Sequence, residues 1–193
     1  MIQHENMESI YEKELRDEIY DERYTTKECE ACTFRNCSFE NVKLGESRFI
    51  DCVFEECNLS SCDVHTAAFR NVTFIKCKMI GLRWDTCNEF GLSMHFVDCV
   101  LDYSVMSGMD LRKTTFDNCS MLEVDLSESN LSQSKLVNCN LIRTTFDNTK
   151  LVATDLRGSI DFDINPKSND IKNMKISRVQ IEGLLNEFDL VID

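Results

Sequence analysis

The chain has 193 residues, enough for one domain with its own core, and a formal net charge of -13. This acidic balance disfavours direct binding to nucleic acid, because such binding depends on lysine and arginine displacing the counterions of the phosphates. No stretch approaches the roughly 18 uncharged apolar residues that a membrane helix needs. The acidic opening is unlike a signal peptide, so we expect a cytoplasmic protein that does not enter a membrane.

Cysteine and glycine usage narrows the fold class further. The eleven cysteines are odd in number, which argues against a scaffold of disulfides in a chain of this length. Six glycines are too few for many tight hairpins or for a glycine-rich phosphate loop. Whatever element repeats in this sequence must therefore turn its corners without them.

Residues 1–31 precede the regular part of the sequence. The first thirty carry ten acidic and four basic side chains, with apolar residues such as Ile10, Leu15 and Ile19 between them. The repeats that begin at Cys32 would expose core and unpaired strand edges at an open end, so we expect residues 1–31 to form an N-terminal cap. An independent interaction arm is the alternative. The sequence leaves open whether the segment is helical or extended.

Residues 32–160 carry a repeat of five residues. A large apolar residue, here called the centre, recurs at Phe34, Phe39, Leu44, Phe49, Phe54, Leu59, Val64, Phe69, Phe74, Met79 and Trp84. After a shift of two residues the centres resume at Phe96, Leu101, Met106, Leu111, Phe116, Met121, Leu126, Leu131, Leu136, Leu141, Phe146, Leu151 and Leu156. Neither a helix nor a strand has this period, so the chain must turn one corner in each pentad.

Four such corners close a coil of twenty residues. Two ladders of like residues confirm this spacing: Phe34, Phe54, Phe74, Phe96 and Phe116, and Cys37, Cys57, Cys77, Cys99, Cys119 and Cys139. Both ladders contain one step of 22 residues at the same place. The phenylalanine and cysteine ladders thus indicate the same period and the same insertion.

The repeat units resemble those of the pentapeptide-repeat proteins, in which a small residue and Asp or Asn precede a central Leu or Phe. Matching units include Cys57-Asn58-Leu59, Val124-Asp125-Leu126 and Thr154-Asp155-Leu156. The resemblance covers about two-thirds of the chain. It implies an all-β fold, the right-handed quadrilateral β-helix of that family, over residues 32–160.

Nine cysteines lie two positions before a centre, where a compact inward-facing residue is expected. A ladder stacks thiols in one line, whereas a tetrahedral metal site needs ligands from several directions, so we expect neither a metal site nor a cofactor. The three histidines are not part of any catalytic motif, and a convex rod offers no pocket to perturb a carboxylate. We therefore expect a protein that is not an enzyme.

The insertion near residues 85–91 breaks the pattern of centres. Phe90 is the apolar residue available to refill the missing core position. Because loops on a regular scaffold often carry function, Phe90 is also a candidate partner-binding residue, although a neutral bulge would give the same sequence.

Residues 161–193 follow the last coil. Pro166 interrupts the pattern, and Ser177 with Gln180 fits a capping box that opens a short helix. The apolar residues of that helix are Ile181, Leu184, Leu185 and Phe188. This ending resembles the C-terminal module of the Qnr, MfpA and microcin-immunity branches of the family, which implies a homodimer joined through these four residues. A lid on a monomer is the alternative.

The same branches imply a partner, because their gyrase-protecting members are thought to imitate DNA. Residues 31–160 contain thirteen basic and seventeen acidic residues, a charge of -4, whereas DNA of about 30 Å carries about 18 charges. Only a selected stripe of outward carboxylates could therefore imitate DNA, and the candidates are Glu55, Glu56, Asp98, Asp102, Asp117 and Glu123. The predicted partner is DNA gyrase or topoisomerase IV. The alternative is a general protein-interaction scaffold with an unknown partner.

Overall fold

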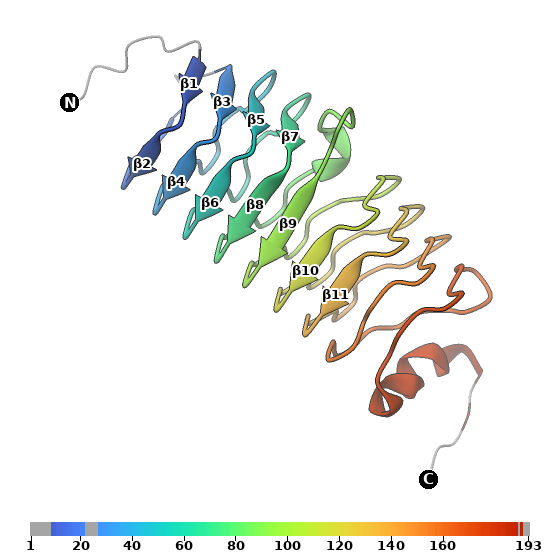
Figure 1. The fold of residues 1–193 in the computed structure, drawn as a ribbon. Helices are drawn as coiled ribbons and strands as arrows, with labels where there is room; N and C mark the ends of the chain where they lie inside the picture. The colour runs from blue at the N-terminus through green and yellow to red at the C-terminus, as the bar shows by residue number, and fades with distance from the viewer. Residues whose placement is uncertain (1–8, 22–26, 189, 191–193) are drawn as a thin grey trace.

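The structure is a computed structural model that describes residues 9–21, 27–188 and 190. The chain winds into coils that stack along one axis and form an elongated rod (Figure 1). Neighbouring strands come from successive coils, and all of them pair in parallel. The fold is therefore a four-sided β-solenoid, and the predicted fold class is confirmed.

Two parallel sheets form two neighbouring sides of the solenoid. Face 1 carries the sheet β1-β3-β5-β7, made of β1 (Ser9–Tyr11), β3 (Glu28–Glu30), β5 (Arg48–Ile50) and β7 (Ala68–Arg70). Face 2 carries the sheet β2-β4-β6-β8-β9-β10-β11, made of β2 (Glu14–Arg16), β4 (Thr33–Arg35), β6 (Val53–Glu55), β8 (Val72–Ile75), β9 (Met94–Val97), β10 (Thr115–Asp117) and β11 (Lys135–Val137). Faces 3 and 4, which begin with the centres Phe39 and Leu44, are joined by isolated bridges, and face 4 contains the 3-10 helix η1 (Trp84–Thr86).

The pairing register follows the predicted period. On face 2, Phe34 pairs with Phe54 and Phe54 with Phe74, and Phe74 pairs with Phe96 across the longer step. Their rings stack nearly parallel, with centroids 4.6, 5.1 and 5.3 Å apart. All of the predicted centres from Phe34 to Leu156 are buried. The core is thus a continuous column of apolar and aromatic contacts, which stabilises the rod by burying area and by ring stacking.

Asn or Asp immediately before a centre favours a turn over a strand. Its side chain accepts a hydrogen bond from the backbone N–H two residues later, as at Asn58, Asp125 and Asn140. This Asx turn competes with the extended backbone. None of the described strands has Asn or Asp at this position, and Thr33, Val53 and Thr73 occupy it in β4, β6 and β8. The Asn or Asp of the repeat therefore acts as a local turn former.

The small position two residues before each centre often carries a hydrogen-bond donor. The thiols of Cys57 and Cys77 donate to the buried carbonyls of Phe34 and Phe54 in the preceding coil, both at 3.3 Å. After the insertion, hydroxyls replace many of the thiols, and Thr154 donates to the carbonyl of Leu131 at 2.7 Å. Each such bond adds a donor to a buried carbonyl, which favours Cys, Ser and Thr at this position.

The two extra residues of the insertion lie in the loop between residues 88 and 94. Asn88 still bridges Ala68 at the regular spacing, whereas Met94 pairs with Val72 at the longer one. The expectation that Phe90 refills the core is wrong, because its side chain is 76% exposed. Leu92 packs against the core instead. The extra residues allow the loop to bulge outward before Leu92 returns to the core.

Residues 9–21 form a coil of the solenoid itself. Ile10 pairs with Cys29 and Leu15 with Phe34, each nineteen residues apart. The regular pairing therefore begins before the boundary expected at residue 32, and this part of the expected cap is extended. This segment buries less apolar surface than the later coils, since Leu15 is only partly buried. The other residues of the expected cap up to position 26 lie outside the described ranges.

The C-terminal segment is bound to the last coil through its helix. The 3-10 helix η2 (Arg178–Leu184) follows Ser177, whose N–H donates to the side-chain oxygen of Gln180 at 2.5 Å. The amide nitrogen of Gln180 in turn donates to the carbonyls of Leu156 and Ser159. A second short helix, η3 (Asn186–Phe188), follows. The open end of the coil stack is thus covered by a segment that satisfies its exposed carbonyls.

Candidate functional site

Three of the six predicted carboxylates are neutralised by cations. Glu55 lies in β6 and forms an ion pair with Arg35 of β4 at 2.8 Å. Glu56, at the corner that follows, lies 3.6 Å from Lys76. Glu123, at the corner after face 3, contacts Arg143 at 2.6 Å. These carboxylates contribute little net charge to the outer surface.

The other three carboxylates have neutral partners. Asp98 accepts a hydrogen bond from the side chain of Asn118 at 2.6 Å, and Asp117 accepts one from Asn138 at 3.2 Å. Asp102, on face 3, accepts hydrogen bonds from the Ser120 hydroxyl at 2.7 Å and from a backbone N–H at 3.0 Å. These bonds hold the carboxylates in place and leave their negative charge uncompensated. The structure thus retains an acidic surface made of Asp98, Asp102 and Asp117, on faces 2 and 3.

An apolar strip that the sequence reasoning missed adjoins this acidic surface on face 3. The backbone N–H that binds Asp102 belongs to Leu122, and the carbonyl of Leu122 accepts from the N–H of Tyr103. Tyr103 is 52% exposed, and both Leu122 and Ile142 are partly exposed. Leu122 and Ile142 are twenty residues apart at an outward position, so a search for outward apolar ladders would have found them. A surface that mixes fixed carboxylates with apolar side chains is suited to binding another protein.

Phe90 is not brought together with the predicted carboxylates. It lies over the other sheet, where its ring centroid is 5.2 Å from the guanidinium carbon of Arg70 in β7. The backbone carbonyl of Phe90 also accepts a hydrogen bond from Nε of Arg70 at 3.3 Å. The loop is therefore a separate surface feature of face 1.

The four predicted dimerisation residues divide into two pairs in the C-terminal segment. Leu184 packs against the core and Leu185 is half-buried, whereas Ile181 and Phe188 are exposed. Phe188 also lies under the ammonium group of Lys167, 4.6 Å from its ring centroid. A 3-10 helix has three residues per turn, so residues spaced for an α-helix do not share one face.

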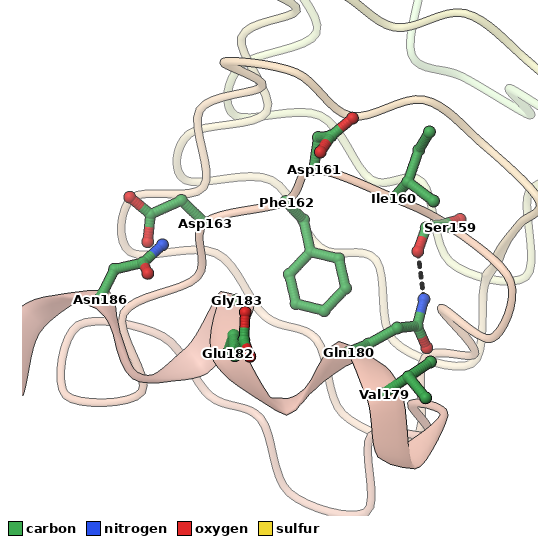
Figure 2. Close-up of a pocket in the computed structure, with 10 residues that line it drawn as sticks. All are labelled: Ser159, Ile160, Asp161, Phe162, Asp163, Val179, Gln180, Glu182, Gly183 and Asn186. Carbon is green, nitrogen blue, oxygen red and sulfur yellow. Dashed lines mark hydrogen bonds between the residues drawn. The ribbon is translucent and has the colours of Figure 1, made fainter. Parts of the chain in front are cut away.

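A cleft of about 480 Å³ lies between η2 and the chain after the last coil (Figure 2). Figure 2 shows the ring of Phe162 between the two segments, beside Gly183. A Cβ at position 183 would lie 2.5 Å from Phe162, so only glycine permits this close approach. Val179 is 88% exposed and Ile160 55% exposed at the rim of the cleft. Neither residue was predicted from the sequence, because only Ile181, Leu184, Leu185 and Phe188 were considered as apolar residues of this segment.

The chemistry of the cysteines is that of buried thiols. All eleven are buried and unbridged. Burial raises the pKa of Cys52 to about 11 and those of Cys62 and Cys87 to about 12, which suppresses the reactive thiolate. Within the described ranges, no three His, Cys, Asp or Glu side chains are grouped so as to hold a metal ion. The same part of the chain has no helix with the length and apolar character to cross a membrane.

Comparison with solved structures places the fold among known solenoids. The chain matches QnrB1, described as a plasmid-mediated fluoroquinolone resistance protein, with a TM-score of 0.64 and 19% identity over 96% of this chain and 100% of that one. It also matches HetL, a pentapeptide repeat protein involved in heterocyst differentiation regulation from the cyanobacterium Nostoc, at 14% identity over 88% and 87% of the two chains, with a TM-score of 0.49. The QnrB1 match shows a shared fold. Comparison with curated proteins finds no match.

Two family models account for the repeat region. The model of the pentapeptide repeat region matches residues 27–93, and the model of eight pentapeptide repeats matches residues 95–133 and 125–160. Together they cover more than half of the chain, on both sides of the insertion loop. The chain therefore belongs to the pentapeptide-repeat proteins.

Proposed function

We propose that this protein acts without catalysis, by presenting the acidic surface and its adjoining apolar strip to a basic surface of another protein. The observation that carries the proposal is the set of neutral partners of Asp98, Asp102 and Asp117. Fixed carboxylates without a nearby cation attract a basic partner over a distance and select it by charge.

DNA gyrase or topoisomerase IV is the partner that we favour. Both enzymes hold duplex DNA, so they must offer basic surfaces that an acidic protein can occupy. The shared fold with a fluoroquinolone resistance protein supports this choice by analogy. Residues 31–160 carry far fewer charges than DNA of the same length, so imitation would rest on the acidic surface rather than on net charge.

The test is a supercoiling assay with gyrase and a fluoroquinolone, with and without the purified protein. Changing Asp98, Asp102 and Asp117 together to Asn should leave stability within about 1 kcal/mol and should reduce both binding and protection. A control variant loses three carboxylates from face 4 and its corner instead, namely Asp63, Glu128 and Asp147, and should protect like the parent. Binding by the parent should weaken with added salt, because screening acts on exposed charge.

Equal protection by the parent and the Asp98, Asp102 and Asp117 variant would reject imitation of DNA by the acidic surface. No binding of gyrase or topoisomerase IV by the parent, even at low salt, would favour the second candidate, a scaffold for another protein. The apolar strip supports that candidate. In that case binding to the partner should be insensitive to salt and should be lost in Tyr103→Ser.

We further propose that two copies associate through the C-terminal segment. The exposed apolar residues Val179, Ile181 and Phe188 support this proposal, because a patch of this kind is shielded from water in a dimer. Changing Val179 and Ile181 together to Asp should give a folded monomer by light scattering. Leu184 is unsuitable for this test because it packs against the core of its own chain. A parent protein that is already monomeric would refute the proposal.

A further inference from the structure

The outer surface of face 1 contains a hollow of about 440 Å³ that the acidic surface does not involve. Arg48, Ala68 and Asn88 follow one another in register at the same outward position of three coils. Ala68 is the short side chain in this column, so the hollow opens above it between two longer neighbours. Thr66 also lines it. Arg48 lies in β5, and Ala68 and Arg70 lie in β7, the strand beside the loop that follows η1 in Figure 1.

Cations predominate around the hollow, although the whole chain is acidic. Lys27, Arg48 and Arg70 line it together with one carboxylate, Glu46. Arg48 is held by Glu28, with ion-pair and hydrogen-bond distances of 2.5 and 2.8 Å. Hydrogen bonds from Arg48 and from Tyr11 hold the pKa of Glu28 below its ordinary value, so this pair stays charged.

Arg70 differs from the other arginines of the solenoid. Those at positions 35, 48, 83, 112, 143 and 157 all form ion pairs with carboxylates. Within the described residues Arg70 forms none, and neither does Lys27. Glu46 lines the same hollow but forms no ion pair with Arg70, so the Arg70 guanidinium is an available binding group for an anion.

The insertion loop holds Arg70 in position. Its Nε donates to the carbonyl of Phe90 at 3.3 Å, and its guanidinium lies against the Phe90 ring. A Cβ on Gly91 would lie 3.4 Å from the same Nε, which shows how closely the loop approaches this side chain. Neither terminal nitrogen of Arg70 makes a hydrogen bond to the described residues, so both remain able to donate to a ligand. Fixing the side chain in advance lowers the entropy lost on binding.

We propose that this hollow binds an oxyanion, either the carboxylate of an acidic segment of a partner protein or a free phosphate. Arg70 supplies the two donors, Lys27 adds a second positive charge, and the insertion loop orients Arg70 through Phe90. Both ligands share the paired oxygens that a guanidinium recognises. The loop thus has a role that is independent of the acidic surface.

The experiment follows the Nε–H resonances of the arginines by NMR while inorganic phosphate or a hexaglutamate peptide is added at low ionic strength. At least one probe should shift to saturation the signals of Arg70 and of Arg48, which also lines the hollow, and the Arg48 signal should show that Arg70→Gln weakens binding about tenfold or more. Phe90→Ala should weaken it by a smaller factor, because Arg70 keeps its charge and loses its orientation. Saturation by phosphate alone assigns the site to a small ligand, and tighter binding of the peptide assigns it to a partner segment.

Arg112→Gln is the matched control, because Arg112 follows a face 1 centre just as Arg70 does but is paired with Asp110. It should leave binding unchanged. Emission of Trp84, the single tryptophan and a fully buried one, reports whether each variant is folded. The proposal is overturned if neither probe shifts the Arg70 signal, or if Arg112→Gln weakens binding as much as Arg70→Gln.

Discussion

The coils before and after the insertion loop share one backbone period but are stabilised by different side chains. Before the loop, both faces 1 and 2 form strands, aromatic rings fill the core, and thiols serve as the small donors. After it, strands remain on face 2 alone within the described residues, leucine and methionine dominate the core, and hydroxyls replace many thiols. The pentad thus specifies the path of the chain, while the residue choice within it adjusts stability.

The outer surfaces of the two regions differ in a related way. The early coils place carboxylates beside cations of the neighbouring coil, as in the pairs of Glu28 with Arg48 and Glu55 with Arg35. Asn partners of carboxylates occur in both regions, as in Asp51 with Asn71 and Asp98 with Asn118, but residues 85–160 contain eleven acidic and six basic side chains, so the region after the loop keeps more uncompensated charge. A regular scaffold can thus carry different binding surfaces along its length without a change of fold.

The largest expected difference between the regions concerns the core. Phe54→Ala removes a ring stacked on two others and should cost about 3 to 5 kcal/mol of unfolding free energy. Leu136→Ala, on the same face after the loop, loses no ring stacking and should cost about 1 kcal/mol less. Urea unfolding followed by Trp84 fluorescence measures both. Equal costs would break the distinction between an aromatic and an aliphatic core.

Alkaline pH should destabilise the early coils through their buried thiols. The pKa of Cys52 is raised to about 11, so its folded form stays protonated while the unfolded form ionises. Its contribution to the free energy of unfolding is therefore complete below the unfolded pKa of about 9. As pH rises towards 11, the free energy of unfolding should fall by about 2 to 3 kcal/mol. Hydrogen exchange should locate the loss before the insertion loop.

Cys52→Ser provides the control for this pH effect, since a hydroxyl does not ionise in this range. Its unfolding free energy should fall less steeply with pH than that of the parent. Constant stability of the parent from pH 9 to 11 would contradict the burial of the thiols.

The smallest effect concerns the donors in the small position. Thr154→Val keeps the size of the side chain but removes the hydroxyl donor of the Leu131 carbonyl, which keeps the N–H of Ser134, so it should cost about 0.5 to 1.5 kcal/mol. Val124→Thr places a hydroxyl in an equivalent position and should change stability by less than about 1 kcal/mol. Chemical denaturation measures both changes. A neutral Thr154→Val variant would show that the position selects for size alone.

The sequence by itself determined the path of the chain. Period, coil length and the presence of a two-residue insertion were all readable, because every inward residue recurs at a fixed spacing and each coil repeats the same burial. The insertion was expected near residues 85–91, and the pairing places it between residues 88 and 94. The Asx turns are local as well, since Asn58 and Asp125 each accept a hydrogen bond from the backbone N–H two residues later.

Tertiary structure decided what the outward side chains do. Charge alone placed Glu55 and Asp98 in one candidate stripe, yet the cross-coil neighbours neutralise Glu55 with Arg35 and leave Asp98 charged beside Asn118. Likewise, an apolar residue in an insertion suggested a core position for Phe90, whereas the loop turned it outward onto Arg70. Inward positions are fixed by the repeat, but contacts between outward side chains depend on which residues the next coil brings within reach.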